Sequence, residues 1–151
     1  MLRVIAAVIL GYIVMAVFVM ATFSLAYVAM GADGAFHPGS YEVSTPWLAI
    51  SIALGAVAAL LGGLVCVRVG RGMRAPQVLA GLVLVLGMLL ALLALRASPA
   101  AEPRAGAVSN MEAMQKAKQP TWISLLNPLI GAAGVMAGAS LRAGAGRTGV
   151  P

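Results

Sequence analysis

The sequence predicts an all-α integral membrane protein, a four-helix bundle whose N-terminus and C-terminus are both cytoplasmic. Composition gives the first reason, since 62% of the 151 residues are hydrophobic and only 9% are charged. The mean hydropathy is +1.00. A soluble domain carries about 25% charged residues, so a water-soluble core is not expected. The apolar residues also gather in four long runs, and the basic residues between those runs are unevenly placed.

The four apolar runs cover residues 4–30, 47–67, 77–95 and 121–141. Each holds about 19 to 27 residues, and a helix of about 20 apolar residues crosses a hydrocarbon layer of about 30 Å. The runs lack the alternation of barrel strands, and backbone groups in lipid must bond within a helix or a closed barrel. We therefore expect one four-span domain over residues 1–142, followed by a flexible tail over residues 143–151.

The connections between the runs differ in charge. The segment 31–46 contains acidic residues but no Lys or Arg, whereas the segment 68–76 contains Arg68, Arg71 and Arg74 and no acidic residue. With four spans, the second connection and both termini share one side, which holds none of the four acidic residues. An excess of Lys and Arg marks the cytoplasmic side. The pattern predicts a bacterial inner-membrane protein whose three loop arginines contact anionic lipid headgroups.

The first run is too long for the 7–15 apolar residues of a signal peptide, so a retained helix is expected, with Gly31 as its C-cap. The segment 31–46 is rich in Gly and Pro and should be irregular. Its Asp33, His37 and Glu42 lack a compact metal motif, so they are interpreted as solvated side chains. No metal site is expected.

Aromatic residues gather where the chain enters the membrane from the outer side. Trp47 and Trp122 each follow closely behind a proline at the start of a run, and Tyr27, Phe36 and Tyr41 lie at the same level. Such residues are typical of an interfacial belt. Trp47 and Trp122 are therefore predicted to anchor the chain at the outer interface.

The second run carries small residues on one helical face, and the third is dominated by Leu and Val. Gly55, Ala59, Gly62 and Cys66 are spaced i, i+4, i+7 and i+11. Small faces allow helices to approach closely in lipid. This face is predicted to contact another helix of the chain or a partner, with Cys66 as a small packing residue.

The third connection, residues 96–120, begins as an Ala/Pro-rich coil and then contains Ser109-Asn110-Met111-Glu112. A Ser followed three residues later by Glu is the signature of a capping box. It predicts a short helix that rests on the outer surface and ends before Pro120.

The fourth run repeats the small-residue pattern. Asn127, Gly131, Gly134 and Gly138 fall on one face, and the last two form a G-x-x-x-G motif. Pro128 removes a backbone donor and predicts a kink in one continuous helix. The alternative is a shorter helix that starts at Pro128 behind an Asn127 cap.

The spans carry no Asp, Glu, Lys, Arg or His, although such residues usually mark ion paths and proton relays in a membrane. The chain also lacks a phosphate loop, useful paired carboxylates and a Ser-His-Asp set. We expect a protein that is not an enzyme and needs no cofactor. The net charge of +6 is interpreted as a record of insertion direction and not of nucleic-acid binding.

The expected partners are the lipid bilayer and either another copy of the chain or another membrane protein. The function favoured by the sequence is that of a structural or accessory subunit that packs through its Gly/Ala faces. The alternative is a channel or uncoupled transporter for a small solute, acting as a homo-oligomer. In that case Asn127 and the backbone freed by Pro128 would line the path.

Overall fold

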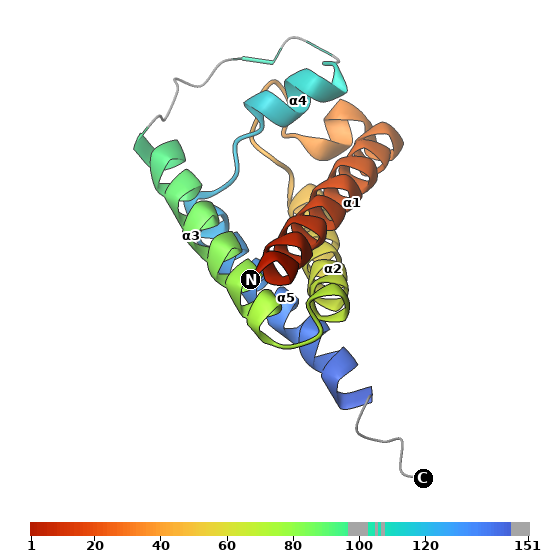
Figure 1. The fold of residues 1–151 in the computed structure, drawn as a ribbon. Coiled ribbons are helices and arrows are strands. Elements are labelled where there is room, and N and C mark those ends of the chain that lie inside the picture. Colours follow the sequence, from red (N-terminus) through yellow and green to blue (C-terminus); the bar gives the residue numbers. More distant parts are fainter. Residues whose placement is uncertain (97–102, 105, 107, 146–151) are drawn as a thin grey trace.

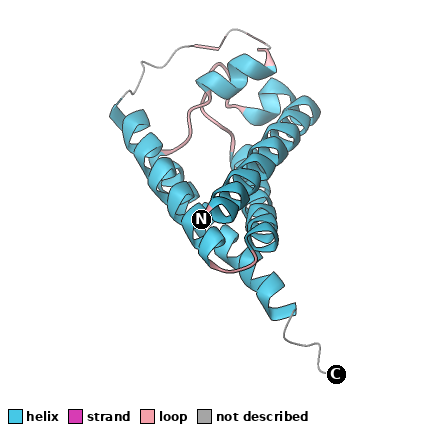
Figure 2. Ribbon diagram, in the orientation of Figure 1, coloured by secondary structure: helices cyan, strands magenta, loops and turns pink. Residues whose placement is uncertain are grey.

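The computed structural model describes residues 1–96, 103, 104, 106 and 108–145 (Figure 1). This part of the chain folds into five helices and contains isolated bridges but no strand (Figure 2). The helices are α1 (Leu2–Ala35), α2 (Thr45–Gly70), α3 (Arg74–Arg96), α4 (Asn110–Lys116) and α5 (Thr121–Ala145). All except α4 are long and apolar enough to cross a membrane. The all-α class and the four candidate spans are therefore confirmed.

Each predicted run lies inside one long helix, and the helices extend beyond the runs. At the start of α2, Ser44 is the N-cap, and its Oγ accepts the Trp47 N–H at 3.3 Å. At its end, Arg71 adopts a left-handed conformation (φ 55°) and donates its N–H to the Val67 carbonyl at 3.0 Å. The last helix runs to Ala145, so the start of the predicted tail is helical. Residues 146–151 lie outside the described part.

Gly31 interrupts α1 with a positive φ of 68°, and one further helical turn follows as far as Ala35. The predicted cap position is thus a kink followed by a final turn in a new direction. Ser44 fixes this turn, because its Oγ donates to the Gly34 carbonyl at 2.6 Å and its N–H donates to the Ala35 carbonyl at 2.9 Å. The end of α1 is therefore tied to the start of α2.

Helix α2 lies at the centre of the arrangement. It packs against α1 on one side and α5 on the other, and α5 in turn packs against α3. Among the described residues α1 and α5 make no contact. Helices α1 and α3 approach each other near the α2–α3 turn and diverge toward α4, which lies at the opposite end of the molecule (Figure 1).

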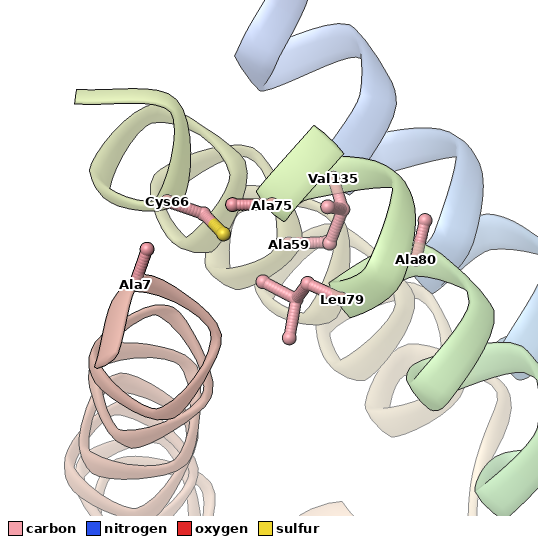
Figure 3. Packing of buried hydrophobic residues seen from close by; sticks show 7 residues of the cluster. All are labelled: Ala7, Ala59, Cys66, Ala75, Leu79, Ala80 and Val135. Atoms are coloured by element: carbon pink, nitrogen blue, oxygen red, sulfur yellow. The ribbon is translucent and has the colours of Figure 1, made fainter. Parts of the chain in front are cut away.

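Small side chains fill the core where the helices converge (Figure 3). This cluster comprises Ala7, Ala59, Cys66, Ala75, Leu79, Ala80 and Val135. Leu79 is fully buried and is the largest side chain of the cluster, while the alanines leave the backbones close together. In lipid the hydrophobic effect does not drive helices together, because the lipid tails are themselves apolar. Helices associate instead through the van der Waals contacts that such close approach allows. The Cys66 thiol is free and buried, so the prediction of a small packing residue is confirmed.

Candidate functional site

The chain folds two distant connections into one layer at the α4 end, which we call the cap (residues 36–44, Arg104 and residues 108–119). Phe36 and Val43 form an antiparallel bridge within the first connection. Lys118 of the third connection donates its N–H to the Tyr41 carbonyl at 2.9 Å and accepts the Val43 N–H at 3.1 Å. Between Ala35 and Thr45 the described chain forms bridges but no helix or strand, which agrees with the irregular segment predicted there. Phe36, Tyr41 and Val43 are buried, because the third connection covers them.

The polar residues of the first connection are arranged differently. Asp33 pairs with Arg104, while His37 and Glu42 are exposed. Within the described ranges no three His, Cys, Asp or Glu side chains come close enough together to hold a metal ion.

Arg104 joins the two connections from inside the cap. Its side chain is only 3% exposed, and its guanidinium lies 6.0 Å from the centre of the Phe36 ring. It donates to the carbonyls of Ser40 (3.3 Å) and Gly106 (2.6 Å) and to the Asp33 carboxylate (2.7 Å). A buried arginine is costly unless its donors are paired, and here the bonds and the aromatic face meet that requirement.

Helix α4 confirms the predicted short helix and its cap. Ser109 Oγ accepts the Glu112 N–H at 3.2 Å. The Tyr41 hydroxyl donates to Glu112 Oε1 at 2.7 Å, and Lys116 Nζ lies 3.4 Å from the same oxygen. The hydrogen bond from Tyr41 and the charge of Lys116 lower the pKa of the Glu112 carboxyl from its ordinary value.

Bonds to α1 hold α4 against the long helices. The Tyr27 hydroxyl donates to the Val108 carbonyl at 2.8 Å, just before the helix begins. Asn110 Nδ2 donates to Ser24 Oγ at 2.9 Å. The Ala113 side chain is buried beneath them. The short helix is therefore docked on α1 by both polar and apolar contacts.

Four aromatic rings pack edge to face in one cluster, formed by Phe23, Tyr27, Phe36 and Trp47. Ring centres lie 6.0 Å apart for Phe23 and Trp47, 6.2 Å for Tyr27 and Trp47, and 6.3 Å for Tyr27 and Phe36. Trp47 is half-buried in this cluster, whereas Trp122 is 61% exposed. The two tryptophans predicted as matching anchors therefore have different surroundings.

A pocket of about 250 Å³ lies between the aromatic cluster and α4. Val19, Phe23 and Tyr27 line it from one face of α1, and Trp47 lines it from the start of α2. Ala113 and Met114 of α4 line it too, as does Ala117, the C-cap of that helix. The pocket therefore has an apolar, largely aromatic wall from α1 and α2 and a second, mainly aliphatic wall from α4 and its C-cap.

Two amide side chains, Asn110 and Gln119, are the polar members of the pocket lining. Asn110 Nδ2 is engaged by Ser24. Gln119 Oε1 accepts from Asn127 Nδ2 at 3.2 Å, which links the pocket lining to α5. The pocket therefore offers a large apolar surface with a few polar groups near its edge, as ligand sites commonly do.

The small residues predicted as a contact face are divided between different neighbours. Gly134 and Gly138 of α5 both face α2. A Cβ atom added at Gly134 would lie 2.7 Å from the Cβ of Ala59, and one added at Gly138 would meet the Leu60 carbonyl. Gly63, which widens the α2 face, meets the Val135 carbonyl of α5 in the same way. This part of the two faces is therefore covered within the chain.

The other residues of the predicted small-residue faces have different neighbours. Gly62 faces Met15 of α1, and Gly131 faces Val83 of α3, whose Cγ1 would lie 2.9 Å from an added Cβ. Gly55 has open space around it. Asn127 is exposed. The spacing of small residues in the sequence does not predict which helix each of them contacts, because each long helix contacts two or three others.

Pro128 lies inside the continuous helix α5, so the alternative of a helix that starts there is wrong. Its ring packs against α3, where a Cβ added at Gly87 would lie 2.8 Å from the Pro128 Cγ. The proline costs one intrahelical hydrogen bond, and it fills the space left by the glycine. Its position thus serves the α3–α5 contact.

The arginines of the α2–α3 turn are solvent-exposed. Arg68, Arg71 and Arg74 all lie on the surface at the end opposite the cap. Arg3 and Arg142 are also exposed near this end, by their places at the start of α1 and the end of α5. In the described part of the chain none of the three turn arginines forms an ion pair, so their charge faces the surroundings.

The sequence pattern predicts neither the pocket nor the burial of Arg104. Asn110 is predicted only as part of the capping box, and Phe23 and Gln119 have no predicted role, because the pocket brings together α1 and the third connection, which are far apart in the chain. The sequence holds one indication of the role of Arg104. It is a single arginine in an Ala/Pro-rich coil, and the connection 31–46 has acidic residues but no Lys or Arg to pair with them. Comparison with protein-family models, curated proteins and solved structures finds no match.

Proposed function

We propose that this chain is a small, non-enzymatic, multi-pass protein of a bacterial inner membrane that serves as a structural or accessory subunit. The observation that carries the proposal is the uneven burial of its four long helices. In the most apolar stretch of each helix, 33% of the residues are buried in α2, but only 17% are buried in α1 and 17% in α3. Helices α1 and α3 therefore present long apolar faces that another membrane protein can cover.

The exposed faces consist of large side chains. On α1, Leu25 is 69% exposed and Val28 is 77% exposed; on α3, Val85 is 66% exposed and Leu90 is 64% exposed. The glycines of α2 and α5 are mostly occupied within the chain, which favours α1 and α3 as the partner faces. Packing through large side chains suits van der Waals association between helices in lipid.

The test compares purification of the wild type with that of two bulky variants, Leu25→Trp on α1 and Val85→Trp on α3. Lipid accommodates a larger side chain, whereas a packed helix interface does not. We expect a stoichiometric partner, or a second copy, to copurify in mild detergent and to be lost from one variant while its helix content stays unchanged. A monomeric wild type without a partner, or assemblies unaffected by both variants, would contradict the proposal.

The same experiment separates internal packing from partner binding. Gly134→Leu and Gly138→Leu act at the α2–α5 contact, so they should lower the stability of the chain itself. Gly55→Leu, where an added side chain meets open space, is the matched control. If Gly138→Leu changed the assembly size and left stability unchanged, the assignment of this face to internal packing would be wrong.

A second candidate function is a channel or uncoupled transporter for a small solute. The observation that favours it is the bond between exposed Asn127 and Gln119 of the pocket, which places polar groups on an otherwise apolar helix. Flux into liposomes that falls with Asn127→Leu would support transport. Equal flux in wild type, Asn127→Leu and protein-free vesicles would contradict it.

A further inference from the structure

The pocket beneath α4 lies near one surface of the membrane if α1 spans it. Phe23 is 20 residues beyond Arg3 in the same helix, and at about 1.5 Å per residue this is about 30 Å, the thickness of the hydrocarbon layer. With Arg3 at one surface, Phe23 and Tyr27 reach the opposite interface. The apolar wall of the pocket therefore lies where acyl chains meet the headgroup region.

The lining of the pocket comes from three parts of the chain. These are α1, Phe36 with the start of α2, and α4 with Ala117 and Gln119 just beyond its end. None of the lining residues belongs to α3 or α5, and α1 and α5 do not touch each other among the described residues. The pocket is not fully enclosed, and at this depth an opening between α1 and α5 would meet lipid.

The volume and the polar groups limit what the pocket can hold. At about 250 Å³ it exceeds the ~150 Å³ apolar cavity that takes up benzene, and it is below the ~300–1,000 Å³ typical of whole drug-sized ligands. It therefore has room for part of a larger apolar molecule. The side-chain amides of Gln119 and Asn110 supply polar groups to this lining.

We propose that this pocket binds one membrane glycerolipid from the leaflet at the α4 end. The upper part of one acyl chain lies between Phe23 and Trp47 on one wall and Ala113 and Ala117 on the other. The ester carbonyl of that chain accepts from the Gln119 amide at the rim. The site is distinct from the apolar faces of α1 and α3 proposed for a partner, and it does not depend on the subunit role.

The two tryptophans provide the readout. In a Trp122→Phe background, Trp47 in the pocket wall is the sole tryptophan. The protein is reconstituted in phosphatidylethanolamine–phosphatidylglycerol vesicles whose acyl chains carry bromine near the ester, and the quenching of fluorescence is compared with that in unbrominated vesicles. We expect strong quenching of Trp47 by the brominated lipid and little quenching by aqueous iodide.

Filling the pocket should abolish this contact. Val19→Phe fills it from α1, and Ala117→Leu fills it from the C-cap of α4. Each should reduce the bromolipid quenching of Trp47 at least twofold and remove a bound lipid detected by native mass spectrometry. Val17→Phe is the matched control, because Val17 is 62% exposed on the same helix and outside the pocket. It should change neither signal.

Three results would overturn the proposal. The first is bromolipid quenching of Trp47 that is unchanged in a folded Val19→Phe or Ala117→Leu variant. The second is quenching by iodide and not by bromolipid, which would identify a water-filled pocket. The third is absence of bromolipid quenching in the wild-type pocket, which is the expected result if a segment of another protein fills it. Because the two filling variants lie in different segments of the chain, α1 and the C-cap of α4, a folding defect in one leaves the other decisive.

Discussion

The Arg104 guanidinium lies 2.7 Å from the Asp33 carboxylate and joins positions 71 residues apart, yet the two partners differ sharply in exposure. The Arg104 side chain is 3% exposed and the Asp33 side chain is 96% exposed. The arginine is therefore held chiefly by the Phe36 ring and by the carbonyls of Ser40 and Gly106. Asp33 reaches it from solvent.

This asymmetry predicts unequal effects of removing the two partners. Arg104→Met should destabilise the cap locally by about 2–4 kcal/mol, because charged hydrogen bonds to backbone carbonyls are lost. Asp33→Asn should cost about 0–1 kcal/mol, as exposed ion pairs do. Hydrogen exchange at the Val43 and Lys118 amides, which bond across the cap, measures both. Equal acceleration by the two variants would mean that the ion pair is the main contact.

Close packing between α2 and α5 predicts that one added methyl group is harmful at Gly63. Its Cβ would meet the Val135 carbonyl, and the backbone there cannot move without separating the helices. We expect Gly63→Ala to lower the free energy of unfolding in detergent by about 1–3 kcal/mol, the usual cost of overpacking.

Gly81→Ala is the control for this change. Gly81 lies on α3 with open space around it, so an alanine should be neutral or stabilising by up to about 1 kcal/mol. Unfolding in sodium dodecyl sulfate, followed by circular dichroism, compares the two. A stability of Gly63→Ala equal to that of Gly81→Ala would show that α2 and α5 do not approach so closely.

Glu112 predicts a pH dependence of the cap. The Tyr41 hydrogen bond, followed by Lys116, lowers the pKa of its carboxyl, so the folded value lies below the unfolded one. Its contribution to stability is present above the unfolded pKa and is lost as the pH falls through the folded pKa. Tyr41→Phe should raise the Glu112 pKa toward its ordinary value.

Carboxyl NMR with carbon-13-labelled glutamate measures that shift, and the resonance that disappears in Glu112→Gln assigns it. A Glu112 titration that is identical in wild type and Tyr41→Phe would contradict the role of the tyrosine hydroxyl.

The proposed orientation predicts which end of the molecule is reached from outside the cell. Cys66 is the sole cysteine of the chain, so Cys66→Ala gives a background without thiols. His37→Cys in the cap and Gly72→Cys in the α2–α3 turn are both at exposed positions. A membrane-impermeant maleimide should label the first and not the second in spheroplasts, and both after permeabilisation. The reverse pattern would place the cap in the cytoplasm.

The sequence was sufficient for the features that depend on local composition. Four apolar runs of spanning length appear as four long helices, and Ser109 caps a short one because the signal lies within four residues. The continuity of α5 through Pro128 also agrees with the favoured interpretation. Each of these depends on a few neighbouring residues or on the solubility of one segment in lipid.

The cap and its pocket depend instead on contacts between segments far apart in the chain. Tyr27 bonds the carbonyl of Val108, and Asn110 bonds Ser24, across 81 and 86 residues. An aromatic residue at the membrane interface has the same sequence signature whether it faces lipid or a neighbouring ring. Trp47 and Trp122 illustrate this. Trp47 is half-buried because α4 and the residues after it fold over it, whereas Trp122 is 61% exposed.

The central place of α2 has a consequence for how the chain enters the membrane during synthesis. Of the four long helices, α5 is the least apolar, so it gains the least free energy from lipid alone. It also emerges last, when α2 already offers Ala59, Leu60 and Gly63 as a complementary surface. The nascent chain thus carries its own docking site for its weakest segment, and the insertion of α5 is coupled to helix assembly.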